Sequence, residues 1–277
     1  MAYKRILTIQ DISCVGQCSM TVAHPILSAC GHETCMLPTA LLSTHTGGFG
    51  KPQVIHLDSC LDGFVQHWQE NRITFDAILT GYLGSVHAVE LVSDLADQLL
   101  APEGILIVDP AMADHGKLYS GLSECYASKM LALCAKADII LPNVTEAAMM
   151  AGMEYCASFD ESYISRLLER MDHPCVVMTG VAYEKGKTGI FLLEEGHRYH
   201  YSHDRIEQNF HGTGDMFAAC FTGALLQGKQ KEEAIQIAAN FVKESISITV
   251  QRPAHWYGVR FESALPGLVR MLQEPTE

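Results

Sequence analysis

Short apolar runs alternate with longer helix-compatible stretches along most of this 277-residue chain. The runs predict strands at residues 5–10, 33–37, 77–80, 105–108, 139–141, 175–179, 188–193 and 198–201. The stretches predict helices at 20–30, 62–70, 88–100, 123–135, 145–151, 161–171, 214–227, 231–249 and 261–272. Such alternation is typical of βαβ units. We therefore expect one α/β domain over residues 1–277, with a mostly parallel central sheet and helices on both faces.

One edge of the expected sheet is the place to look for a ligand site, because ligands of α/β sheets bind beyond the carboxyl ends of the strands. Several strands run there into polar, proline or glycine residues, at Gln10-Asp11, Thr80-Gly81, Val108-Asp109, Leu141-Pro142 and Thr179-Gly180. Such residues are common in ordinary turns. Their shared position at one edge nevertheless predicts a binding site there.

The charge of the chain argues against two classes of partner. It has 32 Asp and Glu residues against 19 Lys and Arg residues, a formal net charge of −13. An acidic surface repels nucleic acid and anionic lipid, so we expect no nucleic-acid partner and no membrane partner. No apolar run has the length of a membrane span, and the first predicted strand begins close to Met1. We therefore expect a cytoplasmic chain without a signal peptide.

The ten cysteines are expected to be reduced thiols, as is usual for cytoplasmic proteins. None of them has the paired spacing of a zinc site. We interpret them as small, mostly buried apolar side chains.

The strongest local signal is the run His211-Gly212-Thr213-Gly214-Asp215, which leads into a predicted helix. Two glycines let the backbone approach a phosphate closely, and their amides bind an anion together with the helix N-terminus. Asp215 lies in the first turn of that helix, where it can accept a proton from a hydroxyl group that attacks phosphorus. The alternative interpretation is that Asp215 only caps the helix.

A second glycine-bearing segment does not qualify as a phosphate loop. Gly180 is followed by Gly186-Lys187-Thr188, but the spacer is one residue too long for a P-loop. The residues after Thr188 also predict a strand, where a P-loop requires a helix. We interpret residues 181–187 as a connection between two strands.

Polar side chains at two strand ends are candidates for a metal site. Asp109 and Asp114 follow one strand, and paired acids suit Mg²⁺ or a monovalent cation because hard cations bind oxygen ligands. Asn143 and Glu146 follow the next strand, where Asn143 can cap a helix and Glu146 can complete a capping box. In the functional interpretation, Glu146 reaches the metal through water. In the structural one, these residues belong to ordinary turns and caps.

The segment Ser43-Thr44-His45-Thr46-Gly47-Gly48-Phe49-Gly50 follows an apolar stretch. Hydroxyl groups and an imidazole between glycines are better suited to binding a small polar ring than to filling a core. Taken alone, His45 would be an ordinary loop histidine.

Taken in order, these segments resemble the ribokinase-like superfamily. The shared features are Gly-Thr-Gly-Asp at 212–215, the strand-end Asp-Pro at 109–110 and Pro-Asn-x-x-Glu at 142–146. The resemblance runs over nearly the whole chain. It implies a ribokinase-like fold and ATP-dependent phosphorylation of a small molecule.

The closer similarity is to pyridoxal kinases. It is carried by the Ile-Gln strand end at 9–10, the Ser-x-His-Thr segment at 43–46 and Gly-Tyr-Leu-Gly at 81–84. Asp109 and Asp114 with the downstream Tyr119 repeat the family's pattern on the adenine side. The resemblance implies phosphorylation of the 5′-hydroxymethyl group of a vitamin B6 vitamer.

The resemblance also implies a role for each matching residue. Asp215 would be the catalytic base, and Gly212, Thr213 and Gly214 would form the anion hole. The nucleotide would be bordered by Asp114, Tyr119, Asn143, Thr179 and Gly180, the pyridine by Asp11, Ser43, His45, Thr46 and Tyr82, and Mg²⁺ would be held by Asp109 and Glu146. Potassium is a further candidate cation beside Mg²⁺.

Two further properties follow from the resemblance. It implies a homodimer without a lid, and only about ten residues separate the first predicted strand from its helix, too few for an inserted β-lid. Asp11 stands where the better-known pyridoxal kinases carry Ser, which favours a protonated or aminated substrate. Leu141 stands where relatives often carry a Thr that binds the monovalent cation.

Two alternative functions are carried forward. A hydroxymethylpyrimidine kinase of thiamine biosynthesis would use the same phosphate machinery, but some such enzymes carry a cysteine close to the catalytic Asp, where this chain has Met216. A vitamer-binding regulator without activity would be free to lose Asp215 and the two glycines, and this chain keeps them.

Overall fold

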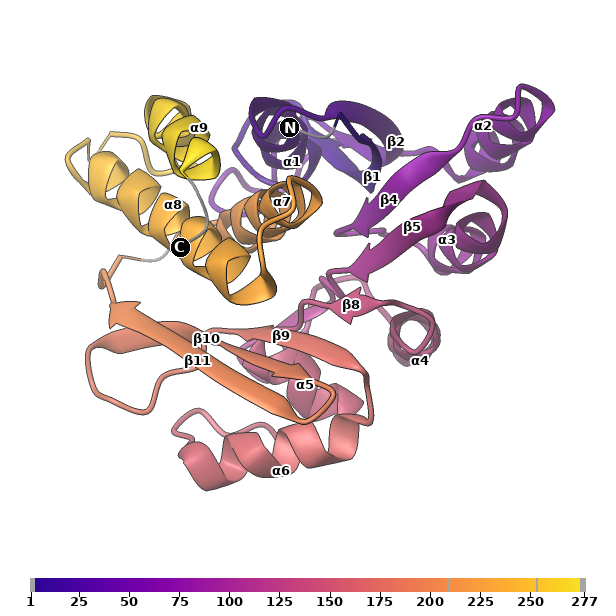
Figure 1. Cartoon of the computed structure of the whole chain (residues 1–277). Helices are drawn as coiled ribbons and strands as arrows, with labels where there is room; N and C mark the ends of the chain where they lie inside the picture. Colours follow the sequence, from indigo (N-terminus) through magenta and orange to yellow (C-terminus); the bar gives the residue numbers. More distant parts are fainter. Residues whose placement is uncertain (1–2, 209, 253, 275–277) are drawn as a thin grey trace.

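A computed structural model of the chain describes residues 3–208, 210–252 and 254–274. In this part of the chain, nine strands form one sheet in the order β11-β10-β9-β8-β5-β4-β1-β2-β3 (Figure 1). The strands are β1 (Arg5–Ser13), β2 (Glu33–Leu42), β3 (Val54–His56), β4 (Phe75–Thr80), β5 (Leu100–Val108), β8 (Ile139–Ile140), β9 (Cys175–Thr179), β10 (Lys187–Glu194) and β11 (His197–Asp204). A small separate hairpin is formed by β6 (Ala113–Asp114) and β7 (Lys117–Leu118).

The central strands are parallel, as the alternation of strands and helices predicts. The order β9-β8-β5-β4-β1-β2 is parallel throughout. Antiparallel pairing occurs at the two ends of the sheet, where β10 and β11 follow β9, and β3 pairs with β2. The expected α/β class with a mostly parallel sheet is confirmed.

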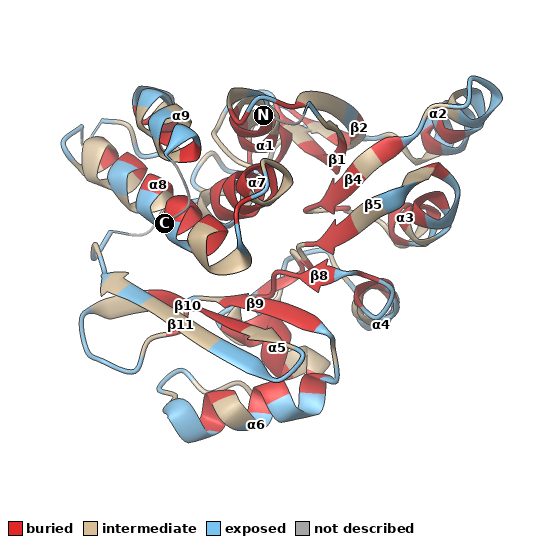
Figure 2. Cartoon of the chain, in the orientation of Figure 1, coloured by how far each residue is buried: buried red, intermediate tan, exposed pale blue. Residues whose placement is uncertain are grey.

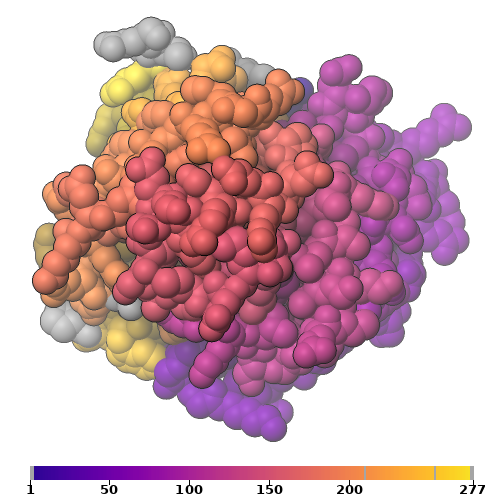
Figure 3. All heavy atoms as spheres, turned by 90° about the horizontal axis from the view of Figure 1, so that it is seen from below, coloured from indigo at the N-terminus to yellow at the C-terminus, as the bar shows by residue number. Residues whose placement is uncertain are grey.

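Helices cover both faces of the sheet (Figure 1). One face carries α1 (Met20–Ala29), α7 (Thr213–Leu226), α8 (Lys231–Val250) and α9 (Leu265–Gln273), and the other carries α2 (Asp58–Glu70), α3 (Val86–Leu99), α4 (Glu124–Cys134), α5 (Val144–Met150) and α6 (Glu161–Met171). A 3₁₀ turn, η1 (Phe261–Ser263), precedes α9. Viewed from below, residues of and around α6 form the front of the molecule (Figure 3).

Each face of the sheet has its own hydrophobic core, and Figure 2 shows the buried residues between the sheet and the helices. Successive residues of a strand point to opposite faces. In β4, Ile78 therefore enters the core under α2–α6, whereas Ala77 and Leu79 enter the core under α1 and α7–α9. Burial on both sides explains why the central strands appear in the sequence as continuous apolar runs.

The structure departs from the predicted elements in a few places. Strand β2 continues through Pro38 to Leu42. Strand β3, the outer neighbour of β2, pairs only with residues Ala40 to Leu42. One side of β2 is therefore unpaired at Pro38, and a strand tolerates proline at such an edge. Strands β3, β6 and β7 are too short to give a periodic signal, and the predicted last helix is divided into η1 and α9.

Two further expectations were tested by the fold. The connection between β1 and α1 spans residues 14–19, which leaves no room for an inserted lid at this point of the chain. Among the described helices, none combines the length and the apolar character needed to cross a membrane.

The prediction that the cysteines are mostly buried is wrong. Cys30, Cys134, Cys175 and Cys220 are buried, but the other six are exposed or partly exposed: Cys14, Cys18, Cys35, Cys60, Cys125 and Cys156. All ten are free thiols.

Candidate active site

A cavity of about 950 Å³ opens at the carboxyl edge of the sheet. Its walls come from the loops after β5, β8 and β9, from β10, and from the beginning of α7 and the middle of α8. Eleven of the predicted site residues line it: Asp109, Asp114, Tyr119, Asn143, Glu146, Thr179, Gly180, Gly212, Thr213, Gly214 and Asp215. Residues from four separate parts of the sequence are thus brought together at one place.

The glycine loop leads into α7 through a left-handed residue. Gly212 has φ 81°, and a Cβ atom there would lie 2.1 Å from the carbonyl oxygen of Gln17. Only glycine fits this position. Gly214 is different, because no atom lies within 4 Å of an added Cβ and its φ is not in the left-handed region. The fold requires the first glycine, whereas any requirement for the second must come from a ligand.

The carboxylate of Asp215 is fixed by the chain segment before α1. Its Oδ2 accepts a hydrogen bond of 2.8 Å from the backbone N–H of Ser19. Burial raises the pKa of Asp215 to about 6, the charge of nearby Asp11 adds to the rise, and the Ser19 N–H opposes it. A carboxylate with a pKa near 6 is a better proton acceptor than an ordinary aspartate and is still ionised at neutral pH.

Ser19 is a site residue that the sequence analysis missed. It precedes α1 with φ 50° and ψ −130°, a backbone conformation that residues other than glycine rarely adopt. Strained residues of this kind cost about 1–3 kcal/mol and are concentrated at functional sites. In this conformation the Ser19 N–H donates to Asp215, which is 196 positions away in the sequence. No local sequence pattern predicts such a contact.

Both carboxylate oxygens of Glu146 accept hydrogen bonds from backbone N–H groups. Its Oε1 accepts from the N–H groups of Met112 (3.0 Å) and Ala113 (3.3 Å), and its Oε2 accepts from the N–H of Asn143 (2.9 Å). The predicted capping box at the start of α5 is confirmed. Burial raises the pKa of Glu146 to about 7 against these three hydrogen bonds. The side chain ties the loop after β5 to the loop after β8.

Asp109 is an acid with little hydrogen bonding to offset the cost of its burial. Its Oδ1 accepts one hydrogen bond, from the N–H of Ala111 at 3.1 Å. Burial, followed by the charges of Glu146 and Asp215, holds the pKa of Asp109 well above its ordinary value. A buried acid among other acids binds a cation readily, because the cation removes the repulsion.

The remaining predicted nucleotide residues surround these acids. The side-chain oxygen of Asn143 accepts from the N–H groups of Thr145 and Glu146, and its Nδ2 donates to the Ala113 carbonyl (2.8 Å). Residue Asn143 also forms a parallel bridge with Thr179. Asp114 and Tyr119 are exposed at the rim of the cavity, as is Gly180.

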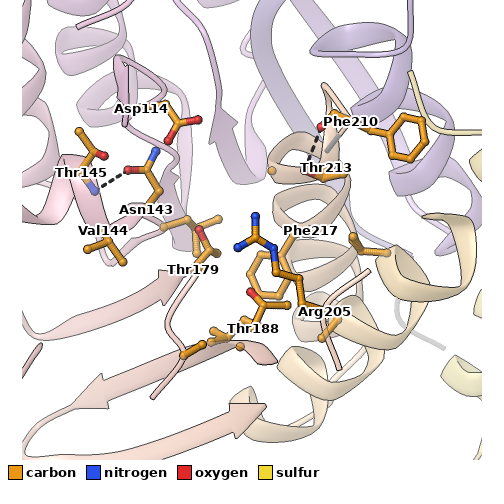
Figure 4. Close-up of a pocket in the computed structure, with 18 of the residues that line it drawn as sticks. Asp114, Asn143, Val144, Thr145, Thr179, Thr188, Arg205, Phe210, Thr213 and Phe217 are labelled. Carbon is orange, nitrogen blue, oxygen red and sulfur yellow. Dashed lines mark hydrogen bonds between the residues drawn. The ribbon is translucent and has the colours of Figure 1, made fainter. Parts of the chain in front are cut away.

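The cavity has a cationic side chain that sequence analysis overlooked. The guanidinium group of Arg205, just after β11, points into the cavity between Thr179 and Thr213, and Phe217 lies behind it (Figure 4). A single arginine after a strand has no distinguishing sequence signal.

The segment rejected as a P-loop is confirmed as a connection between two strands. Lys187 begins β10, and its Nζ donates to Asp204 of β11 at 2.8 Å.

Two predicted substrate residues, Asp11 and Tyr82, do not line the large cavity. Asp11 is near the end of β1 and is 4% exposed. Burial raises the pKa values of both Asp215 and Tyr82, and the charge of Asp11 raises them further. Tyr82 follows β4, the neighbour of β1 in the sheet. Asp11 therefore lies near both Asp215 and Tyr82.

The segment 43–50 packs beside the glycine loop. His45 is buried: the N–H of Gly47 donates to its Nδ1 (2.8 Å), and its Nε2 donates to the carbonyl of Tyr257 (3.2 Å). The rings of His45 and His211 have centroids 5.0 Å apart. Ser43 and Thr46 are largely solvent-accessible, and the hydroxyl of Ser43 accepts from the N–H of Gln53. Contact of these three side chains with a pyridine ring stays a prediction.

The chain matches the family described as phosphomethylpyrimidine kinase over residues 27–258 and belongs to that family. A pyridoxine/pyridoxal/pyridoxamine kinase of Bordetella avium is 28% identical over 262 residues, which are 88% of this chain and 85% of that enzyme. A hydroxymethylpyrimidine/phosphomethylpyrimidine kinase of Haemophilus influenzae is 27% identical and matches 60% of this chain and 63% of that enzyme.

Among solved structures, the pyridoxal kinase of Lactobacillus plantarum superposes with a TM-score of 0.89. It is 32% identical, and 98% of each chain is covered. The resemblance to pyridoxal kinases and the ribokinase-like fold are thereby confirmed, and the chain is a kinase that acts on a hydroxymethyl group.

The two glycines of the loop provide a first test of the site. Gly214→Ala should fold normally, because its Cβ meets no atom of the protein. It should lower kcat/KM for ATP at least about ten-fold, since the added methyl group lies where a phosphate would meet the backbone. Gly63→Ala on α2, which also meets no atom, is the matched control and should change nothing. Equal activity of both variants in a coupled assay would show that no phosphate approaches Gly214.

Proposed function

We propose that this kinase transfers the γ-phosphoryl group of ATP to the 5′-hydroxymethyl group of a vitamin B6 vitamer, in pyridoxal phosphate salvage. The observation that carries the proposal is the position of Asp215. Its carboxylate lies in the first turn of α7, beside the glycine loop and between the 950 Å³ cavity and the region around Asp11. The cavity has the size and polar lining for a nucleotide, and Asp11, which is expected to border the acceptor ring, lies near Asp215.

In the proposed reaction, Asp215 accepts the proton of the attacking hydroxyl group while the backbone amides of residues 212–214 bind the transferring phosphoryl group. Arg205 adds positive charge on the nucleotide side. Phosphoryl transfer requires little covalent participation by the protein, so alignment and charge stabilisation supply most of the rate enhancement. The N–H of Ser19 keeps the Asp215 carboxylate oriented between the two substrates.

The residues present fit Mg²⁺ as the companion of ATP. Within residues 3–208, 210–252 and 254–274, no three His, Cys, Asp or Glu side chains form a complete metal site. Asp109 offers an oxygen ligand in a site with excess negative charge, and bound Mg²⁺ commonly takes its other ligands from phosphates and water. Glu146 would act through water, since its oxygens already accept backbone hydrogen bonds. The ion would neutralise charge on the phosphates.

Asp109→Asn should raise the Mg²⁺ concentration needed for half-maximal activity by at least about ten-fold, because a charged ligand is lost. The exposed Asp97 on α3 supplies the control Asp97→Asn, which should leave the Mg²⁺ requirement unchanged. Titration of activity with Mg²⁺ at fixed ATP decides the matter. An unchanged midpoint in folded Asp109→Asn protein would exclude Asp109 as a ligand.

The role of Asp215 predicts both a mutational and a pH effect. Asp215→Asn should fold but lose at least about 10²-fold in kcat, the scale expected for loss of a general base. The base works ionised and its pKa is raised to about 6, so wild-type kcat/KM should fall as the pH drops through about 6 and level off above about 7. Near-normal turnover of Asp215→Asn, or a flat profile down to about pH 5, would exclude this role.

A hydroxymethylpyrimidine kinase is the second candidate, because the family and the Haemophilus influenzae relative carry that description. A coupled assay with pyridoxal, pyridoxamine, pyridoxine, hydroxymethylpyrimidine and ribose separates the candidates. The proposal expects the highest kcat/KM with a B6 vitamer. Binding of vitamers without turnover of any substrate would instead favour a regulator.

We also propose that the chain forms a homodimer. The support is strand β3 at the edge of the sheet, where Val54 and Ile55 are 43% and 62% exposed. Exposed apolar edge strands tend to pair with another chain. Light scattering should show a dimer that Ile55→Lys weakens, while a monomeric wild type at concentrations of about 10 μM would contradict the proposal.

A cytoplasmic location is proposed as well, supported by ten thiols of which none is paired in a disulfide. Fractionation of cells that express the chain would test it, and recovery with an oxidising compartment would contradict it.

A further inference from the structure

The direction of the Arg205 side chain follows from the register of strand β11. Successive residues of a strand point to opposite faces. Tyr201 points towards α8, because its hydroxyl donates to Oδ1 of Asn240 on that helix at 2.9 Å. Further along the chain, His203 and Arg205 line the large cavity, whereas Asp204 between them does not. Arg205, directly after the strand, thus continues the alternation and is directed into the cavity.

The end of the β10–β11 hairpin holds Arg205 in place. The backbone N–H of Arg205 donates to the carbonyl of Gly186 at 2.8 Å. One residue earlier, Asp204 pairs in register with Lys187, and Lys187 Nζ donates to Asp204 Oδ1 at 2.8 Å. A side chain supported by a paired strand is positioned more precisely than one on a free loop. The hairpin therefore presents a guanidinium group to the cavity at a defined place.

That place is beside the glycine loop. Figure 4 shows the guanidinium group of Arg205 between Thr179, the last residue of β9, and Thr213, the first residue of α7. Phe217, one turn further along α7 and only 5% exposed, lies behind it. An apolar wall strengthens charge interactions, because it keeps water away from one side of the charge. The guanidinium group can thus reach the oxygens of a phosphoryl group bound at the start of α7.

The charges around the cavity create a need for such a group. The acids described above border the same cavity, and they repel the phosphates of a nucleotide. Among the residues that the structure describes, three Lys or Arg side chains line it: Lys187, Arg205 and Lys243. Lys187 already binds Asp204, and Lys243 lies in the middle of α8. Arg205 is the one that Figure 4 places next to Thr213.

We infer that Arg205 is a further catalytic residue, whose guanidinium group binds the phosphoryl group while it passes from the nucleotide to the acceptor. The inference rests on the proposed function in one respect, that the glycine loop receives the transferring phosphoryl group. It deepens that function by naming a side chain that stabilises the transition state.

The chemistry explains why an arginine suits this position. The bond from the γ-phosphorus to the ADP oxygen breaks, the bond to the acceptor oxygen forms, and the acceptor proton goes to Asp215. Arg205 forms no covalent bond and keeps its protons. During the transfer, negative charge spreads over the three equatorial oxygens of the phosphoryl group. The planar guanidinium group can donate to two of these oxygens at once, which a lysine cannot do in the same way.

The test compares Arg205→Ala and Arg205→Lys with the wild type in steady-state assays at saturating acceptor. Arg205→Ala should lose at least about 10²-fold in kcat, while its KM for ATP changes less than about three-fold, because the contact strengthens only in the transition state. Arg205→Lys keeps the charge without the fork and should lose at least about ten-fold in kcat. Arg198→Ala is the matched control. Arg198 lies on the same strand, outside the cavity and 4.0 Å from Glu169, so its loss should leave kcat unchanged.

Chemical rescue separates a catalytic from a structural role. Added guanidinium chloride should raise kcat of Arg205→Ala at least about five-fold, whereas the same concentration of sodium chloride should not. A raised KM with normal kcat would confine Arg205 to nucleotide binding and overturn the inference. Normal values of both constants, or no rescue by guanidinium, would overturn it as well. Should Arg205→Ala not fold, a wild-type kcat of Arg205→Lys is sufficient to reject the inference.

A binding experiment distinguishes failure of this inference from failure of the proposed function. If the wild type phosphorylates no ring compound, the proposed function fails, and calorimetry with Mg-ADP and aluminium fluoride then decides on Arg205. Aluminium fluoride imitates the phosphoryl group in transit. Arg205→Ala should bind it at least about ten-fold more weakly while binding Mg-ADP alone as the wild type does. Equal affinities for aluminium fluoride in the two proteins would overturn the role of Arg205.

Discussion

The site depends on one hydrogen bond, from the backbone N–H of Ser19 to Asp215. It joins the start of α1 to the start of α7, which lie 196 residues apart in the sequence. The contact is possible because the two helices pack closely: a Cβ at Gly212 would meet the carbonyl of Gln17 at 2.1 Å, and one at Gly223 would meet the Cys30 sulfur at 2.5 Å. Glycine at both points lets the helices approach until an amide reaches the carboxylate.

The same edge of the sheet concentrates acids at the expense of stability. Burial raises the pKa values of Asp11, Asp109, Glu146 and Asp215. An acid with a raised native pKa binds more protons in the folded than in the unfolded state, so its contribution to the free energy of unfolding falls as the pH rises between the two pKa values. At neutral pH these acids therefore destabilise the empty protein. A cation that bound among these acids in the folded form would offset that cost.

The features of the site that could be predicted from the sequence are those encoded within a few consecutive residues. The strand ends, the glycine loop and the capping box of Asn143 and Glu146 are each encoded within a few consecutive residues, and the sheet brings them together. Ser19 could not be recognised, because its role depends on a strained backbone and a partner in a distant helix. Arg205 could not either, since its orientation depends on how the β10–β11 hairpin lies over the cavity. Strand β3 is too short to produce a pattern.

The two sides of the site come from different parts of the fold. The cavity proposed for the nucleotide is built from the strand ends of β5, β8 and β9, from β10 and from α7 and α8, whereas Asp11 and Tyr82 come from β1 and the loop after β4. Asp215 and Ser19 connect the sides. If the proposed roles hold, residues near Asp11 could change without disturbing the residues that line the cavity. This separation gives a physical reason why one family contains kinases for both pyridine and pyrimidine rings. Under the proposed function, the acceptor would bind where β1 ends, and the chemistry would take place where α7 begins.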